Sequence, residues 1–242
     1  DTLSDAPART RRVPTPDRAE RIAIAGILLA VVVYLPVVVY RAGVRGFGDV
    51  QVFFRAGWAV WTGFPLYQVT DNHGWSYHYP PTFALVMGPF ANPLPGHPQP
   101  WWALPLPAAV GVWYVLSAIA AFAAVHVWAS ALERHAGVTV SDRGWWALRL
   151  GPLLALLLYL GTGFARGQPT AILILLVCGF LVLAAERKPA GAAWTLSAAI
   201  AAKIFPAVFV LIPFLRRDGR MFVHGILACV ILAACESAPP PP

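Results

Sequence analysis

The stretch IAIAGILLAVVVYLPVVVY, residues Ile22–Tyr40, decides the fold class because it contains no charged side chain. An α-helix needs about 20 such residues to cross a hydrocarbon core roughly 30 Å thick. A cleaved signal peptide is the alternative, but this run is long for the apolar part of a signal peptide and lacks an Ala-x-Ala exit. We therefore expect a retained transmembrane helix.

The composition of the whole chain points the same way. Hydrophobic residues make up 58% of the 242 residues, charged residues only 12%, and the mean hydropathy is +0.64. Such a chain cannot cover a water-facing surface with polar side chains, which excludes a soluble globular domain. The net charge of +7 does not indicate a nucleic-acid partner, because Lys and Arg cluster between apolar runs rather than along one helix face. We predict an all-α multi-pass membrane protein that has the lipid bilayer as a partner.

Further apolar runs predict more helices along the chain. They are residues Pro107–Ser130, Trp146–Ala165, Thr170–Ala185, Pro189–Leu215 and Met221–Cys235. Lys203 lies near the middle of the fourth run, so we predict that it marks a turn between two short helices. Residues Thr82–Leu94 form an apolar stretch that is too short to span, and we predict a re-entrant or interfacial segment there.

The chain divides into three predicted segments. Residues 1–21 are rich in Arg and Pro and are expected to form a disordered basic tail in the cytoplasm. Residues 22–235 form the transmembrane module, with residues 41–79 as a large first outer loop that contains a predicted short helix at the membrane surface, Val50–Trp61. Residues 236–242 are a Pro-rich end. Because no Met begins the chain and this end follows a short apolar run, we expect a truncated reading frame.

Positive charge in the connections predicts the topology, since cytoplasmic loops are enriched in Lys and Arg. If the fourth run breaks at Lys203 and Thr82–Leu94 does not cross, most of the 18 Lys and Arg residues fall on the side of the amino terminus. We therefore predict a plasma membrane protein with a cytoplasmic amino terminus. The outer face then carries Asp49 together with the cations Arg41, Arg45, Arg55, Arg166 and Lys203.

Two of these cations are candidate anion ligands. An ammonium at membrane depth costs roughly 2.5 to 3.5 kcal/mol on insertion scales, so Lys203 needs a polar partner, and an anionic ligand would supply one. Snorkelling to the interface is the other explanation. Arg166 lies between Gly163 and Gly167, which allow tight turns, and its guanidinium can grip two phosphate oxygens. A helix-ending arginine at the lipid headgroups has the same pattern.

The outer loop also offers a candidate base. Asp49 follows Gly46-Phe47-Gly48, a predicted turn that presents its carboxylate beyond the first helix. A carboxylate there can take a proton from an attacking hydroxyl, although exposed loop aspartates are often only solvated. Asp71 lies in the sequence Val69-Thr70-Asp71-Asn72, which predicts a turn. Gln168 can hydrogen-bond a sugar hydroxyl or serve as an ordinary loop residue.

Several short motifs occur together in a characteristic order. They are Asp49 with Gly57 and Gly63, Pro65-Leu66-Tyr67, Tyr77-His78-Tyr79-Pro80-Pro81, Gly167-Gln168, and Lys203 with Pro206. In their order and spacing, over roughly residues 41–217, the sequence resembles glycosyltransferase family 87 of the GT-C superfamily. This resemblance implies a GT-C-like helical bundle with a large first extracytoplasmic loop. It also implies inverting transfer of a sugar, often mannose, from a polyprenyl-phosphate donor to a hydroxyl of a glycan or glycolipid acceptor.

The resemblance implies a role for each candidate residue. Asp49 would be the general base, and Arg166 and Lys203 would bind the donor phosphate and stabilise the charge that builds as it leaves. The residues that could line a groove for the sugar or the lipid are Tyr67, Tyr77, His78, Tyr79 and Gln168. An interfacial aromatic belt explains the tyrosines equally well. Because the outer loop contains no Asp-x-Asp pair, we expect neither a divalent metal nor another cofactor.

Two other functions fit the same residues. A lipid flippase or transporter would also keep a lysine at membrane depth and broken helices around an anion path, and it predicts an internal repeat. A non-catalytic membrane subunit would tolerate the loss of Asp49.

Overall fold

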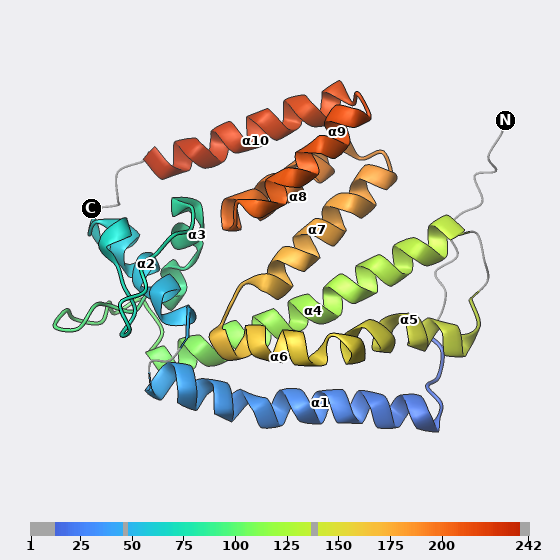
Figure 1. Ribbon diagram of the computed structural model, residues 1–242, viewed down its shortest axis with the longest axis horizontal. Coiled ribbons are helices and arrows are strands. Elements are labelled where there is room, and N and C mark those ends of the chain that lie inside the picture. Colours follow the sequence, from blue (N-terminus) through green and yellow to red (C-terminus); the bar gives the residue numbers. More distant parts are fainter. Residues whose placement is uncertain (1–12, 46–47, 137–139, 238–242) are drawn as a thin grey trace.

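A computed structural model describes residues 13–45, 48–136 and 140–237 of the chain (Figure 1). The chain is 75% helical, and the described residues contain no β-strand, only an isolated bridge between Thr70 and Ser76. The helices lie in layers and run back and forth between two ends of a bundle, with the short helices α2 and α3 gathered at one end. The all-α prediction is confirmed.

Two long helices form one side of the bundle. Helix α1, Arg18–Val38, continues as a π-helical turn, Val39–Val44, and the two together are long and apolar enough to cross a membrane. Helix α4, Leu106–Ala136, is a second candidate span and packs against α1. The first predicted helix is confirmed, but it begins at Arg18 rather than Ile22, because Asp17 and Glu20 form a capping box. Residues 18–21 therefore belong to the helix, and residues 1–12 of the predicted tail lie outside the described part.

The next predicted helix is broken in two. Helix α5, Asp142–Ala155, and helix α6, Leu157–Arg166, are bent by 54° relative to each other, and they reach spanning length only as a pair. Pro152 lies in the last turn of α5. As a proline it has no backbone N–H to donate, and its ring crowds the preceding turn. The sequence predicted a helix over the apolar run Trp146–Ala165, and the structure divides this run at Leu156.

The remaining helices stack as consecutive hairpins. Helix α7, Thr170–Ala185, packs between α4 and helix α8, Pro189–Ala202, and α8 packs on α10, Gly219–Ser237. Lys203 ends α8 in extended backbone conformation, and the chain continues as a 3-10 helix, Phe205–Val210, and helix α9, Leu211–Leu215. The predicted break at Lys203 is confirmed.

The segment after α1 folds into short helices rather than a span. Helix α2, Val50–Thr62, is followed by a 3-10 turn, Leu66–Gln68, by helix α3, Pro81–Val86, and by a second 3-10 turn, Gly88–Phe90. The prediction that Thr82–Leu94 does not cross is therefore confirmed. Helix α2 exists where predicted, but its side chains from Val50 to Ala59 are all buried, so protein rather than a membrane surface surrounds it. Its aromatic side chains pack on α3 and α4, which makes it the core of this region.

The basic residues are divided between the two ends of the bundle. The α4–α5, α7–α8 and α9–α10 connections lie at the end where α1 begins (Figure 1), and ion pairs there join Arg134 to Glu186 at 2.8 Å and Arg143 to Asp17 at 3.4 Å. The other end, which we term the loop end, carries residues 41–45 and 48–105, the α6–α7 connection and the break after α8 at Lys203. All five cations assigned to the outer face lie at the loop end. The separation of charge on which the predicted topology rests is thus present in the fold.

Candidate active site

Asp49 and Gln168 meet at the loop end, although 119 positions separate them in the sequence. The side-chain amide of Gln168 donates a hydrogen bond from Nε2 to Oδ2 of Asp49 at 2.8 Å. Asp49 occupies the N-cap position of α2, yet its side chain does not cap the helix backbone. The carboxylate is therefore held by a residue of the α6–α7 connection rather than by its own helix. Two residues singled out in the sequence thus lie in direct contact.

Two glycines make this contact possible. Gly48 has a φ of +123°, and a Cβ atom there would lie 3.1 Å from the carbonyl oxygen of Arg166. Gly167 has a φ of +70°, and a Cβ atom there would collide with the side chain of Val50. The indole Nε1 of Trp113 donates to the carbonyl of Gly167 at 2.8 Å in a buried position. The start of α2 and the end of α6 therefore approach each other closely, which fixes Asp49 beside Gln168. Residues 46–47 of the predicted turn lie outside the described residues.

A polar cavity of about 590 Å³ opens beside this pair. The residues that line it with polar side chains are Tyr34, Arg41, Tyr159, Thr162, Arg166, Gln168 and Thr170. These described lining residues include two guanidinium groups and no carboxylate. The cavity thus suits an anion, and Gln168 joins its wall to Asp49. A negatively charged group in the cavity would lie next to a carboxylate that can accept a proton.

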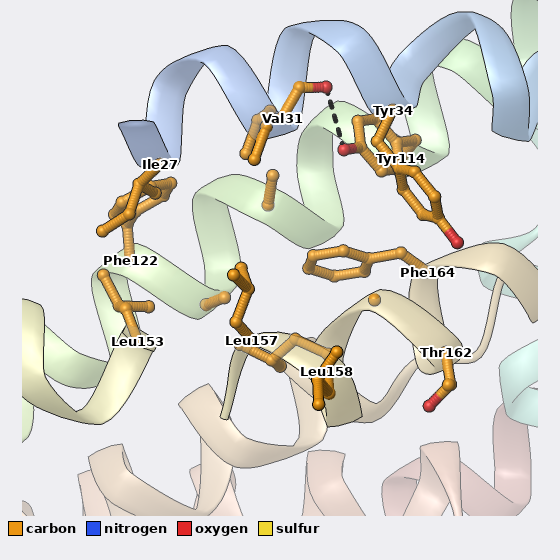
Figure 2. A pocket seen from close by; sticks show the side chains of 15 residues that line it. Ile27, Val31, Tyr34, Tyr114, Phe122, Leu153, Leu157, Leu158, Thr162 and Phe164 are labelled. Atoms are coloured by element: carbon orange, nitrogen blue, oxygen red, sulfur yellow. Dashed lines mark hydrogen bonds between the residues drawn. The ribbon is translucent and has the colours of Figure 1, made fainter. Parts of the chain in front are cut away.

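An apolar cavity of about 330 Å³ adjoins the polar one, because Tyr34 and Thr162 line both. It lies between α1, α4 and the bent pair α5–α6 (Figure 2). Figure 2 shows Ile27, Phe122 and Leu153 at one side of this cavity, and Tyr34 and Thr162 at the other. An apolar cavity and a cationic cavity are therefore neighbours at this site.

Lys203 lies at the same end but in different surroundings. Its Nζ atom is 5.4 Å from the ring centre of Tyr79 and 5.9 Å from that of Phe205, and it is not among the residues that line the polar cavity. The ring of Tyr79 packs edge-on against Phe53 at 4.8 Å, one turn after Asp49 on α2. The role of Lys203 in binding the donor phosphate, expected from the resemblance, stays a prediction.

The predicted groove tyrosines pack against one another, with ring centres 6.2 Å apart for Tyr67 and Tyr77 and 5.9 Å apart for Tyr77 and Tyr79. Tyr77 is only 1% exposed, and its hydroxyl donates to the carbonyl of Pro80 at 2.7 Å, so its ring belongs to the core. Tyr67 is 60% exposed and packs against Tyr77 with ring centres 6.2 Å apart. His78 is exposed, and none of the residues Tyr67, Tyr77, His78 and Tyr79 lines either of the two cavities. Of the predicted groove residues, Gln168 alone reaches the polar cavity.

Asp71 and Arg55 hold the outer loop onto α2. Oδ1 of Asp71 accepts hydrogen bonds from the backbone amides of His73 at 2.7 Å and Trp75 at 2.9 Å, which confirms the predicted turn. Arg55 is 4% exposed and donates to the Thr70 carbonyl at 2.6 Å. Burial lowers the pKa of Arg55 from its ordinary value, and the nearby Asp71 carboxylate opposes that shift. The carboxylate of Asp71 thus binds backbone amides of its own loop, whereas the side chain of Asp49 does not cap the backbone of its own helix.

Two features of this site had no clear signal in the sequence. Trp113 lies inside an apolar run, where an indole is usually only a packing residue. Arg41 follows the first hydrophobic run and was interpreted only as a topology signal.

Within the described ranges, no three His, Cys, Asp or Glu side chains are placed to hold a metal ion. The expected absence of a metal stays a prediction.

Comparison with known proteins gives one match. The family model described as glycosyltransferase family 87 matches residues 77–241. No curated protein and no solved structure matches the chain. The matched range includes Arg166, Gln168 and Lys203 but begins after Asp49, which is linked to it by the hydrogen bond from Gln168.

Proposed function

The chain belongs to glycosyltransferase family 87, and from this premise we propose that it transfers a sugar, mannose, from a polyprenyl-phosphate donor to a hydroxyl of a glycan or glycolipid acceptor. Family membership and the apolar helices make it a membrane glycosyltransferase that binds a sugar donor and an acceptor. In this proposal the loop end faces away from the cytoplasm, the amino terminus lies inside, and the membrane is the plasma membrane.

One observation carries the proposal: a carboxylate is held beside a cationic cavity. Gln168 contacts Oδ2 of Asp49, which leaves Oδ1 for the proton of an acceptor hydroxyl. Arg166 lines the adjoining cavity and can pair with two phosphate oxygens of the donor. A base for the acceptor and a cation for the leaving group are the two parts that sugar transfer from a phosphate carrier requires.

The reaction follows from this placement. The acceptor oxygen attacks the anomeric carbon opposite the phosphate, and its proton passes to Asp49. The bond from the anomeric carbon to the phosphate oxygen breaks, and the electron pair leaves with the phosphate. Arg166 stabilises the negative charge that develops there, while the sugar passes through an oxocarbenium-like state. Attack from the far side inverts the anomeric configuration, and no metal takes part in this proposal. Lys203 lies outside the cavity, so phosphate binding is assigned to Arg166.

The substitution Asp49→Asn tests this assignment. The full chain, in membranes, is supplied with polyprenyl-phosphate mannose labelled in the sugar, and transfer to membrane acceptors is measured. Removing a general base should lower kcat by a factor of about 10² to 10⁴ with little change in KM for the donor. Asp17→Asn is the matched control, because it makes the same chemical change at the opposite end and Asn also caps helices.

Transfer by Asp49→Asn at the rate of Asp17→Asn would contradict the proposed mechanism. Movement of the lipid donor across the membrane without sugar transfer, in the unchanged chain, would instead support a flippase.

A further inference from the structure

The polar cavity contains a second guanidinium that the proposed function does not use. Arg41 lines this cavity together with Arg166, and both side chains are exposed to it from different elements. Arg41 belongs to the π-helical turn Val39–Val44 that follows α1. Such turns occur often at functional sites, where they redirect side chains. A Cβ atom on Gly43 would lie 2.9 Å from the Cα atom of Pro107, so this turn is pressed against the start of α4. The backbone of the turn that carries Arg41 is therefore held against α4.

The apolar cavity adjoins the polar cavity that these two cations line. Tyr34, which lines both cavities, precedes Arg41 on the same continuous helix, and Thr162 precedes Arg166 on α6. Two of the elements that line the apolar cavity, α6 and the continuous helix formed by α1 and its π-helical turn, thus also carry the two guanidinium groups. A ligand that fills both cavities must combine an anionic group with an apolar chain.

The surroundings of the apolar cavity indicate where such a chain would come from. Leu158 lines the cavity and is 87% exposed on α6, and Leu29 of α1 is 63% exposed. Side chains of this kind face lipid in a membrane protein. A chain in this cavity can therefore extend into the bilayer, which a soluble nucleotide or free phosphate has no means to use.

We propose that Arg41 and Arg166 together bind the phosphate of a lipid phosphate, whose apolar chain enters the cavity between α1 and α6. This inference rests on the proposed function and gives the second phosphate cation to Arg41 instead of Lys203. Two guanidinium groups from separate helices can contact different phosphate oxygens at once, which a single arginine does less completely. Arg41 thus acts in binding the donor and the lipid phosphate that remains after transfer.

The experiment measures binding of undecaprenyl monophosphate to the full chain in phosphatidylcholine nanodiscs. Arg41→Gln should weaken binding at least tenfold, as should Arg166→Gln. Arg45→Gln is the matched control, because Arg45 follows the same turn, stacks over Tyr40 at 5.2 Å and does not line the cavity. Arg45→Gln and Lys203→Gln should stay within about twofold of the unchanged chain, since a site of two cations loses affinity only where a phosphate contact is lost. Binding by Arg41→Gln equal to that of Arg45→Gln would overturn the proposal, and so would a loss in Lys203→Gln as large as in Arg166→Gln.

Further arms separate the sources of the phosphate. Undecaprenol, which has the chain without the phosphate, should bind equally to Arg41→Gln and to the unchanged chain. Excess inorganic phosphate and phosphatidylglycerol should not displace undecaprenyl monophosphate. Displacement by either one at similar concentration would show a general anion site and overturn the proposal.

A parallel transfer assay separates this inference from the proposed function. If the unchanged chain transfers sugar, Arg41→Gln should raise KM for the donor more than it lowers kcat. Transfer with equal KM in Arg41→Gln and Arg45→Gln would overturn the inference and leave the function intact. Binding that depends on Arg41 without any transfer by the unchanged chain would support the lipid-phosphate site and contradict the function.

Discussion

Gly167 determines where the candidate base lies. Its positive φ of +70° and its closeness to Val50 let the end of α6 contact the start of α2, and its carbonyl is held by Trp113 at 2.8 Å. The next residue, Gln168, then reaches Asp49. The Gly167-Gln168 pair is therefore a geometric requirement of the site, because a side chain at position 167 would separate the two helices.

Gly167→Ala should destabilise the protein and disturb the site. We expect a loss of about 1 to 3 kcal/mol, because alanine is strained at this φ and its Cβ atom collides with Val50. Gly151→Ala is the matched control, since nothing lies within 4 Å of a Cβ atom there, and the residue is inside α5 and does not line the polar cavity. Thermal unfolding in detergent and sugar transfer should both fall for Gly167→Ala, while Gly151→Ala is neutral or slightly stabilising. Equal behaviour of the two variants would show that the close approach is unimportant.

The sequence marked some residues of the site by distinctive local chemistry. Asp49, Arg166 and Gln168 lie beside glycines that mark tight turns, and the structure brings these three residues together. The burial of Tyr77 and the position of Arg41 in a cavity wall were not predicted, for a common reason. Whether a tyrosine lies in the core or in a groove, and whether an arginine lines a cavity, depends on contacts with distant segments that no local pattern contains.

Helix α5 is attached to α4 by a buried ionic cluster centred on Arg149. Its guanidinium is within 2.8 Å of Glu133 and 3.1 Å of Ser130, and it lies 3.8 Å from the ring centre of Trp145. Arg149 is 7% exposed. An arginine in an apolar helix is tolerated here because a carboxylate and further hydrogen-bond partners on two helices satisfy it.

Glu133→Gln should therefore lower the free energy of unfolding by about 2 kcal/mol, because it leaves a buried guanidinium without its counter-charge. Glu186→Gln is the matched control, since the partners of Glu186, Arg134 and Lys188, are exposed and the pair should contribute less than about 1 kcal/mol. Thermal unfolding in detergent measures both variants. A Tm of Glu133→Gln no lower than that of Glu186→Gln would rule out the cluster as a stabilising element.

The contribution of Glu186 to stability depends on pH. The hydrogen bond from Lys188 is the main cause that lowers the pKa of Glu186 below its ordinary value. The small stabilisation by Glu186 is therefore present above the ordinary carboxyl pKa and is lost as the pH falls through the lowered value. Glu186→Gln should remove this part of the acid sensitivity, which unfolding at a series of pH values would detect.

The lengths of the hydrophobic runs predicted which helices exist better than they predicted the bends and the burial of those helices. Helix α7 has the predicted bounds, Thr170–Ala185, and the break at Lys203 followed from a charge inside an apolar run. The bend between α5 and α6 was missed because the apolar residues run on through the position of the break at Leu156. The burial of α2 was missed because its apolar spacing also fits a helix on a membrane surface.

At the scale of the whole molecule, the charged residues and the cavities are both arranged along the direction that joins the two ends of the bundle. Basic residues paired with acids lie at the end where α1 begins, whereas the loop end holds Asp49, the two cavity arginines and Lys203. The distribution of Lys and Arg in the sequence predicted this division of charge between the two ends. Successive helices run in opposite directions, so the connections between apolar runs lie at alternating ends. The cavities could not be predicted, since they arise between α1, α4 and the bent pair α5–α6.

Labelling of single cysteines in intact cells tests most directly the claim that the acid and the cations share one face outside the cytoplasm. In a chain whose three native cysteines are replaced by alanine, a membrane-impermeant maleimide should label Trp75→Cys and Ile204→Cys, which are 73% and 74% exposed at the loop end. Arg143→Cys, at the opposite end, should be labelled only after the membrane is permeabilised. Labelling of positions 75 and 204 from opposite sides, or of both only after permeabilisation, would contradict the account.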